Sequence, residues 1–175
     1  AAVVTFVSGG VVSTTDGGTV SGGTYAGSGT GQLTVTASAC AAIIKKACTA
    51  MKTMTSGGDD YLAEEMGKGF KKMADDGVVT TTVTGTLTPP SPATPISPYG
   101  GAAKGTISCS ETNLVTKLKA LFQKMYNQRE QEGFDGNKEF AKELANGINS
   151  FYTSGTISTD GQGNIAGSSG SGSIS

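Results

Sequence analysis

The residues best suited to chemistry in this sequence are four carboxylates at the start of one predicted helix, Asp59, Asp60, Glu64 and Glu65. Clustered carboxylates can hold a cation or divide acid and base roles between them. Acidic side chains in a first helical turn also interact favourably with the helix dipole on a solvated face. The helix-dipole interpretation needs no ligand and is the simpler one, and a cation or acid-base site remains the alternative.

Two other segments resemble ligand-binding motifs but lack key residues. The glycine-rich stretch at 27–31 has no Gly-Lys-Ser/Thr ending, which a phosphate-binding loop requires. The stretch at 160–164 resembles the start of a calcium loop but has no downstream acidic ligand. We therefore expect no cofactor, no metal ion and no catalytic residue, and we predict that the chain is not an enzyme.

The sequence contains no histidine, and its net charge is −1. Without histidine, the chain can form neither a Ser-His-Asp nor a Cys-His catalytic arrangement. It also lacks the residue that most often acts as a general base. A nucleic-acid binder would show a basic excess, so we expect no nucleic-acid partner. No apolar run reaches the roughly 18 residues of a membrane span, so we expect no membrane partner. The first seven residues lack a basic region and do not read as a signal peptide.

Three cysteines, Cys40, Cys48 and Cys109, form no Cys-x-x-Cys pair and leave an odd count. Buried reduced thiols are the simplest interpretation, and a disulfide between subunits is the alternative. Three scattered thiols are a poor metal site.

Charged residues divide the chain into alternating blocks. Of the 27 charged residues, 12 fall in 39–76 and 12 in 111–149, with six basic and six acidic residues in each block. The remaining segments are rich in glycine, threonine and serine. These three residue types supply 69 of the 175 residues of the whole chain. Regular alternation of this kind suggests an internal repeat.

Each charged block has the apolar spacing of a helical hairpin. The spacing predicts helices at about 39–54, 60–75, 111–128 and 138–152, with Asp59 and Asn137 as N-caps of the second and fourth. A shift of 78 residues aligns the second helix of one hairpin with that of the other, and a shift of 71 aligns the first helices. We interpret this as an internal duplication.

Gly69 and Gly147 occupy matching positions inside the two duplicated helices. A glycine inside a helix costs about 0.5–1 kcal/mol relative to alanine. Its recurrence indicates close approach to another backbone, with a tolerated defect as the alternative.

Segments rich in β-branched residues flank both hairpins and predict pairs of strands. They include Thr5-Phe6-Val7, the run 78–87 and the run 155–159. The predicted fold is α+β, with internally duplicated helical hairpins alternating with Thr/Gly-rich β-strand pairs.

The predicted organisation has five parts. They are an N-terminal β-rich arm (1–38), a first αα-β repeat (39–88), a Pro/Gly-rich loop (89–104), a second αα-β repeat (105–160) and a Gly/Ser-rich C-terminal tail (161–175). The loop contains all five prolines, Pro89, Pro90, Pro92, Pro95 and Pro98. It could be a flexible linker between the halves, an arm lying on a neighbouring subunit, or a ligand for a proline-recognition domain.

Two segments carry a resemblance to a known class of protein. The run 77–90, Gly-Val-Val-Thr-Thr-Thr-Val-Thr-Gly-Thr-Leu-Thr-Pro-Pro, and the run 141–157 resemble the small Gly/Thr-rich virion structural proteins of tailed bacteriophages. The resemblance implies a component of a capsid, neck or tail, and it transfers no catalytic residue.

The sequence therefore favours a non-enzymatic structural component of a bacteriophage virion. It would be a capsid cement or decoration protein, or a neck or tail protein. Such a protein would stabilise an assembly through β-arms and extended termini, with copies of itself and other virion proteins as partners. It would be found in the virion after assembly in the host cytoplasm. The alternative is a secreted bacterial surface or adhesion module, which would be extracellular or on the cell surface.

Overall fold

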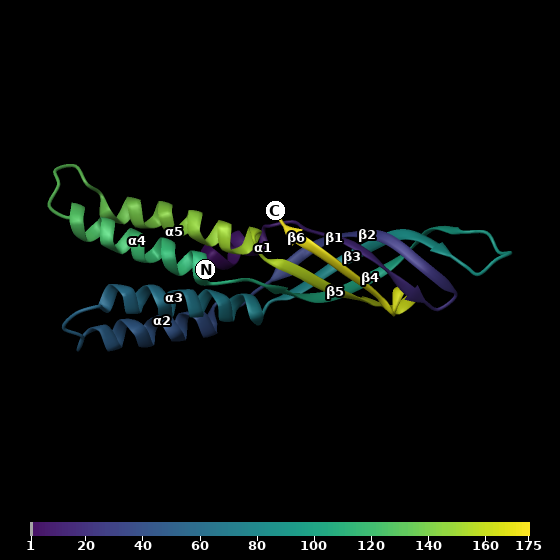
Figure 1. The fold of residues 1–175 in the computed structure, drawn as a ribbon, viewed down its shortest axis with the longest axis horizontal. Coiled ribbons are helices and arrows are strands. Elements are labelled where there is room, and N and C mark those ends of the chain that lie inside the picture. The colour runs from purple at the N-terminus through teal and green to yellow at the C-terminus, as the bar shows by residue number, and fades with distance from the viewer. Residues whose placement is uncertain (1) are drawn as a thin grey trace. The chain divides into compact units, whose positions relative to one another are not determined.

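A computed structural model describes residues 2–175, which form mixed α and β structure (Figure 1). The helices are α1 (Ala2–Ser8), α2 (Ser38–Met51), α3 (Gly58–Asp75), α4 (Thr112–Gln128) and α5 (Gly136–Thr153). The strands are β1 (Val12–Val20), β2 (Gly23–Thr34), β3 (Val78–Thr88), β4 (Ile96–Ser108), β5 (Thr156–Gln162) and β6 (Ser168–Ile174). A short 3₁₀ turn, Gly163–Ile165, joins β5 to β6.

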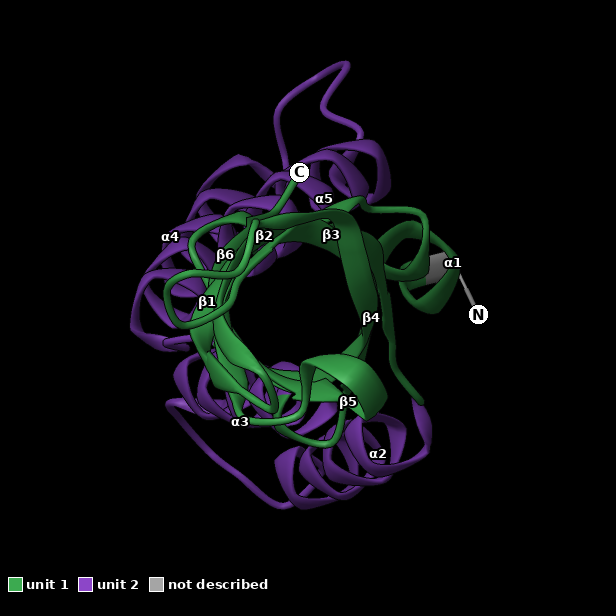
Figure 2. Cartoon of the chain, turned by 90° about the vertical axis from the view of Figure 1, so that its right-hand side faces the viewer, with its two compact units in different colours: residues 1–36, 75–108, 153–175 green, residues 37–74, 109–152 purple. Residues whose placement is uncertain are grey.

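The chain divides into two compact units, each described separately below. The first comprises residues 1–36, 75–108 and 153–175, and the second comprises residues 37–74 and 109–152 (Figure 2). Each unit is assembled from separate stretches of the chain. The structural division therefore differs from the five consecutive parts that the sequence suggests.

The first unit is a closed antiparallel barrel. Every strand pairs with the next one along the chain, and β6 pairs with β1 to close the cylinder. Closure leaves no unpaired strand edge. Side chains alternate inward and outward along each strand, as the alternation of buried and exposed positions over residues 78–84 of β3 shows.

The barrel interior has three layers. At the end where β1, β3 and β5 begin, the buried side chains are aliphatic: Val12, Leu33, Val79, Ile107, Ile157 and Ile174. Toward the other end, a second apolar cluster contains Val20, Tyr25, Val83, Leu87, Ala103 and Ile165. Between them on β1 lie Thr14 and Asp16, which share a polar layer with Thr159 of β5. A six-stranded barrel is narrow, so these side chains fill it.

Glycines at inward positions make this narrow interior sterically feasible. A Cβ atom on Gly31 would lie 1.9 Å from the Thr80 carbonyl oxygen, and one on Gly172 would lie 1.9 Å from that of Ser13. The same conflict with a neighbouring backbone occurs at Gly85 and Gly105. Only glycine allows adjacent strands to approach this closely on the inside of the barrel.

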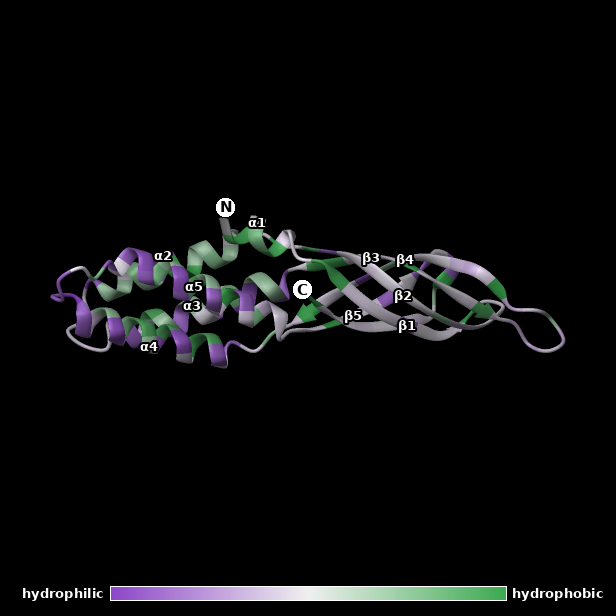
Figure 3. Ribbon diagram, turned by 90° about the horizontal axis from the view of Figure 1, so that it is seen from above, coloured by the Kyte–Doolittle hydropathy of each residue, from purple (hydrophilic) through white to green (hydrophobic). Residues whose placement is uncertain are grey.

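The second unit contains α2, α3, α4 and α5. Each helix presents an apolar stripe at helical spacing and charged residues elsewhere, visible as alternating colours along the helices (Figure 3). The buried stripe residues include Met66, Phe70 and Met73 of α3 and Leu114, Leu118 and Leu121 of α4. All four helices begin and end within three residues of the limits predicted from the sequence.

The predicted N-caps were wrong for both hairpins. Helix α3 begins at Gly58 and α5 at Gly136, so Asp59 and Asn137 lie inside the first turn. The residue that caps α5 is Asp135, whose carboxylate accepts a hydrogen bond of 3.0 Å from the Lys138 amide.

Several glycine-rich or N-terminal segments also differ from expectation. Residues 5–7 lie in α1 rather than in a strand. The predicted arm, 1–38, contributes β1 and β2 to the barrel of its own chain. The predicted tail, 161–175, contributes β6, which pairs with both β1 and β5. The alternate glycines of β2 and β6, Gly27, Gly29, Gly31, Gly170 and Gly172, lie at inward positions, so their spacing indicates close packing rather than flexibility.

The predicted loop 89–104 is shorter in the structure. Residues 96–104 belong to β4, which pairs with β3 from Leu87–Ile96 to Val79–Gly105. What remains is the β3–β4 turn, residues 89–95, which connects two neighbouring strands of one unit. Most of the predicted loop is therefore strand, and the connection that remains lies between two paired strands.

Candidate functional site

The polar layer of the barrel is built around a buried carboxylate. Asp16 is 2% exposed, and it accepts hydrogen bonds from the Thr14 hydroxyl at 2.6 Å and from the Thr159 hydroxyl at 3.1 Å. A Cβ on Gly170 would lie 2.1 Å from Asp16 Oδ1, so the carboxylate occupies the space that the glycine leaves. Two hydroxyl donors offset part of the cost of burying this acid.

Tyr25 lies in the adjoining apolar cluster. Its hydroxyl is buried and has no hydrogen-bond partner among the described residues. Burial raises the pKa of this phenol, and the nearby Asp16 carboxylate raises it further. The hydroxyl therefore stays protonated, and its burial without a partner carries a desolvation cost.

A second tyrosine anchors the base of the β3–β4 turn. Tyr99 donates a hydrogen bond of 2.9 Å to the Asn164 carbonyl, and its ring lies 6.2 Å from that of Tyr25. These contacts hold β4 in place at Tyr99, the residue after Pro98. The preceding residues, 90–98, are all exposed, including Ile96 at 49%. Of the five prolines, Pro89, Pro90, Pro92 and Pro95 lie in the turn and Pro98 lies in β4.

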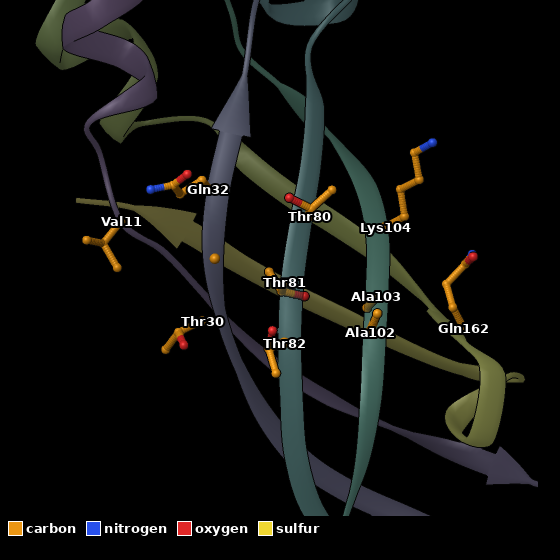
Figure 4. Close-up of a pocket in the computed structure, with 11 residues that line it drawn as sticks. Val11, Thr30, Gln32, Thr80, Thr81, Thr82, Ala102, Ala103, Lys104 and Gln162 are labelled. Atoms are coloured by element: carbon orange, nitrogen blue, oxygen red, sulfur yellow. The ribbon is translucent and has the colours of Figure 1, made fainter.

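A groove crosses the outside of the barrel. It has a volume of about 700 Å³ and runs over β2, β3, β4 and the end of β5 (Figure 4). Register pairing aligns two outward rows across these strands, Thr30–Thr82–Ala102–Gln162 and Gln32–Thr80–Lys104. The small side chain of Ala102 lies on the floor of the groove, and Val11 lies at one end. The lining contains hydroxyls, amides and one ammonium group, with no carboxylate and no aromatic ring.

The matching helix glycines lie at close contacts within the helical unit. A Cβ on Gly69 would lie 3.2 Å from Cys40 Sγ and 3.4 Å from the Cys40 carbonyl oxygen. One on Gly147 would lie 3.0 Å from a methyl carbon of Leu114. Sequence reasoning missed Gly67, where a Cβ would lie only 2.3 Å from a Val115 methyl carbon. Gly67 has no counterpart glycine in the other hairpin, so the repeat gave no signal for it.

The three cysteines are all thiols, and the structure joins none of them in a disulfide. Cys40 and Cys109 are buried and Cys48 is exposed. Burial raises the pKa of the Cys40 thiol, which makes this thiol inert at neutral pH. The pKa of buried Tyr152 is raised by burial first, then by Cys109 and Cys40.

Three of the four candidate carboxylates, Asp60, Glu64 and Glu65, form ion pairs on the helix surface. Lys119 of α4 contacts Glu64 at 2.7 Å and Asp60 at 4.0 Å, and Lys68 contacts Glu65 at 2.5 Å. The hydrogen bond from Lys119 lowers the pKa of Glu64, and the same bond raises the pKa of Lys119. The two Lys119 pairs join α3 to α4, whereas the Lys68–Glu65 pair lies within α3, and all three favour the structural interpretation of the acidic cluster.

Other candidate sites are dispersed. Residues 160–164 span the end of β5 and the start of the 3₁₀ turn rather than a helix-flanked calcium loop. Among residues 2–175, no three His, Cys, Asp or Glu side chains are grouped as metal ligands require. None of the described helices is both long and apolar enough to cross a bilayer.

Comparison with known proteins adds no relative. The chain matches no known protein family, curated protein or solved structure.

Proposed function

We propose that this protein is a non-enzymatic structural component of a bacteriophage virion, either a capsid decoration protein or a neck or tail protein. The observation that carries the proposal is the outward face of the barrel. Most of its exposed positions carry hydroxyl side chains, and these occur on every strand, among them Ser13, Thr15, Ser28, Thr80, Thr84, Thr106, Ser158 and Ser171. Along the described strands, Lys104 and Asp160 are the exposed charges.

The chemistry of that face suits repeated contact with other subunits. Charged groups lose hydration when a neighbour covers them, and interface centres are accordingly poor in charge. Small hydroxyl side chains are desolvated at lower cost and leave a low-relief surface. The resemblance of residues 77–90 and 141–157 to phage virion proteins supports a virion as the assembly.

We also infer that the two αα-β segments arose by duplication. Helices α3 and α5 are both 18 residues long, and both their first and last residues differ by 78 positions. The strands that follow, β3 and β5, begin at Val78 and Thr156, which are also 78 positions apart. This is the sequence shift that aligns Gly69 with Gly147.

The proposal is tested on purified particles. Virions from the host that carries the gene should contain peptides of this chain at a fixed ratio to the major capsid protein. Retention of that ratio through density-gradient purification is the expected result. Absence from particles, together with surface labelling of intact cells, would instead establish the alternative, a secreted bacterial surface or adhesion module.

A further inference from the structure

We propose that the polar layer inside the barrel binds a monovalent metal cation, with the Asp16 carboxylate as its charged ligand. Hydroxyl oxygens of the surrounding threonine and tyrosine side chains complete the site. The inference concerns the barrel by itself, so it does not depend on the assembly to which the protein belongs. It assigns a ligand to a layer whose polar groups do not fully satisfy one another.

The barrel encloses a negative charge without a positive charge to balance it. Asp16 is 2% exposed, and the other buried polar side chains in the described part of the chain are neutral: Thr14, Thr81, Thr159 and Ser168. The Thr14 and Thr159 hydroxyls donate to the carboxylate at 2.6 and 3.1 Å, but they bring no charge. Buried charges in proteins are normally paired with an opposite charge or bound to a metal ion. A cation at this layer would supply the missing opposite charge.

Three threonines occupy equivalent positions in the barrel. Neighbouring strands are antiparallel, so β1, β3 and β5 run in the same direction. Each of the three carries a buried aliphatic residue followed, two positions later, by a buried threonine: Val12 and Thr14, Val79 and Thr81, and Ile157 and Thr159. The aliphatic residues belong to one end layer of the barrel. The next inward position along each strand therefore places the three threonines together in the polar layer.

Two hydroxyls at this layer have no partner. The Thr81 hydroxyl is buried and, unlike its two counterparts, makes no hydrogen bond with a described residue. The Tyr25 hydroxyl is also buried without a partner. It reaches the layer over Gly27, where a Cβ would lie 2.2 Å from it, and Gly27 pairs with Asp16 across the β1–β2 ladder. Buried hydroxyls without partners are costly, and a bound ion would provide the partner for both.

Glycines on the strands beside β1 allow the oxygens to gather around Asp16. A Cβ on Gly29 would lie 2.5 Å from the Thr14 hydroxyl oxygen and 3.2 Å from Asp16 Oδ2. One on Gly170 would lie 2.1 Å from Asp16 Oδ1 and 2.5 Å from the Thr159 hydroxyl oxygen. A hydroxyl that donates its proton to a carboxylate keeps lone pairs with which it can also contact a cation.

The donor set fits a monovalent cation better than a divalent one. All of its atoms are oxygens, which are the ligands that hard cations prefer. Asp16 supplies one negative charge, which balances one positive charge. Calcium sites draw on several carboxylates, and residues 2–175 contain no group of three acidic, histidine or cysteine side chains at metal-binding spacing. Sodium is therefore the ion with which the site is probed.

The test is urea unfolding of the full chain in sodium chloride and in choline chloride at equal ionic strength. A cation that binds only the folded barrel stabilises it, so above the dissociation constant a tenfold rise in sodium should lower the unfolding equilibrium constant by up to about tenfold. Choline is a bulky organic cation and should give no such dependence, and equal ionic strength keeps the screening of surface charges constant. Asp16→Asn should abolish the sodium response. Asp160→Asn, at an exposed position of β5, is the matched control and should retain it.

Two milder variants keep the test decisive if Asp16→Asn does not fold. Thr81→Val and Tyr25→Phe each remove one unpartnered hydroxyl and leave the carboxylate in place. In choline chloride each should be at least as stable as the wild type, yet each should need at least about tenfold more sodium for the same stabilisation. Equal stability of the wild type in both salts would overturn the cation site and leave a buried water as the partner of these hydroxyls. A sodium response that survives Asp16→Asn, or that neither milder variant weakens, would also overturn it.

Discussion

The barrel and the helical unit both depend on glycines at close contacts, but the glycines compared in the two regions lie against different kinds of atom. In the barrel, the atoms that a Cβ on Gly31, Gly85 or Gly105 would strike belong to the backbone of a neighbouring strand. In the helices, the corresponding atoms at Gly67 and Gly147 are side-chain methyl groups. A side chain can change its rotamer, whereas a paired strand can move only if its inter-strand hydrogen bonds break. Replacing a glycine with a larger residue should therefore destabilise the barrel far more than the helical unit.

The two regions also differ in how they meet solvent. The charged blocks 39–76 and 111–149 supply 24 of the 27 charges and cover the helices, while the strands present hydroxyls. Ion pairs such as Lys119–Glu64 link helices at the surface. The barrel instead places its buried charge, Asp16, inside. Stability in the barrel should therefore respond to interior polar changes, and stability in the helices to pH.

The largest effect is expected at Gly31. Gly31→Ala places a Cβ against the Thr80 carbonyl, so the β2–β3 ladder must open, and we expect a loss of more than about 3 kcal/mol of unfolding free energy. Ser28→Ala, at an outward position of the same strand, is the control and should change stability by less than about 0.5 kcal/mol. Urea unfolding followed by circular dichroism measures both. Equal stability of the two variants would contradict the close strand approach.

The helices and the barrel also differ in how well the sequence predicts them. The helices are predictable because apolar spacing in residues such as Leu114, Leu118 and Leu121 is a local signal. The barrel is not, because β1 and β6 pair across more than 150 residues of chain. Alternate glycines at 27, 29 and 31 were an available signal of period two. Taken locally, the same stretch resembles a phosphate-binding loop rather than a strand, because glycine also occurs in such loops.

The candidate site was predictable only in part. The position and proline content of the β3–β4 turn follow from the sequence. The groove does not, since it exists only where Thr30, Thr82, Ala102 and Gln162 come into register across four strands. Asp16 carried no sequence signal beyond being an isolated charge.

The next effect concerns that isolated charge. Asp16→Ala leaves the Thr14 and Thr159 hydroxyls buried without their acceptor, which should cost about 2–4 kcal/mol. Asp160→Ala, at an exposed position on β5, should cost less than about 0.5 kcal/mol. Thermal unfolding of the two variants makes the comparison. Similar melting temperatures would mean that the polar layer does not stabilise the barrel.

A smaller effect is expected for the helix glycine. Gly67→Ala forces a methyl against Val115, and we expect a net loss of about 1–3 kcal/mol, reduced by the higher helix propensity of alanine. Val115→Ala in the same chain removes the obstructing methyl groups. A double-mutant cycle should show a favourable coupling of about 1 kcal/mol or more, and strict additivity would argue against this contact.

The two barrel tyrosines should give effects of opposite sign. Tyr25→Phe removes a buried hydroxyl without a described partner, so stability should stay the same or rise by up to about 1 kcal/mol. Tyr99→Phe removes the hydrogen bond to Asn164 and should lower stability by about 0.5–1.5 kcal/mol. The pair is compared by chemical unfolding in a sodium-free buffer. A loss at Tyr25 as large as at Tyr99 would reveal a partner for the Tyr25 hydroxyl.

The smallest effect is the response of the helical unit to acid. Lys119 lowers the pKa of Glu64 in the folded protein, so the folded state binds a proton less readily than the unfolded chain does. The stabilisation is therefore complete above the ordinary value of 4.5 and disappears as pH falls through the lowered pKa. Glu64→Gln removes it at every pH. The melting temperature of the wild type should exceed that of Glu64→Gln near neutrality, and the two should converge below pH 4.5. This difference in melting temperature should be small because the pair is exposed.

A difference that persisted unchanged into acid would mean that the Glu64 side chain stabilises the protein without its charge, by hydrogen bonding. The acid sensitivity of the helices would then have to come from another carboxylate, with Glu139, whose pKa Lys124 also lowers, as the next residue to substitute.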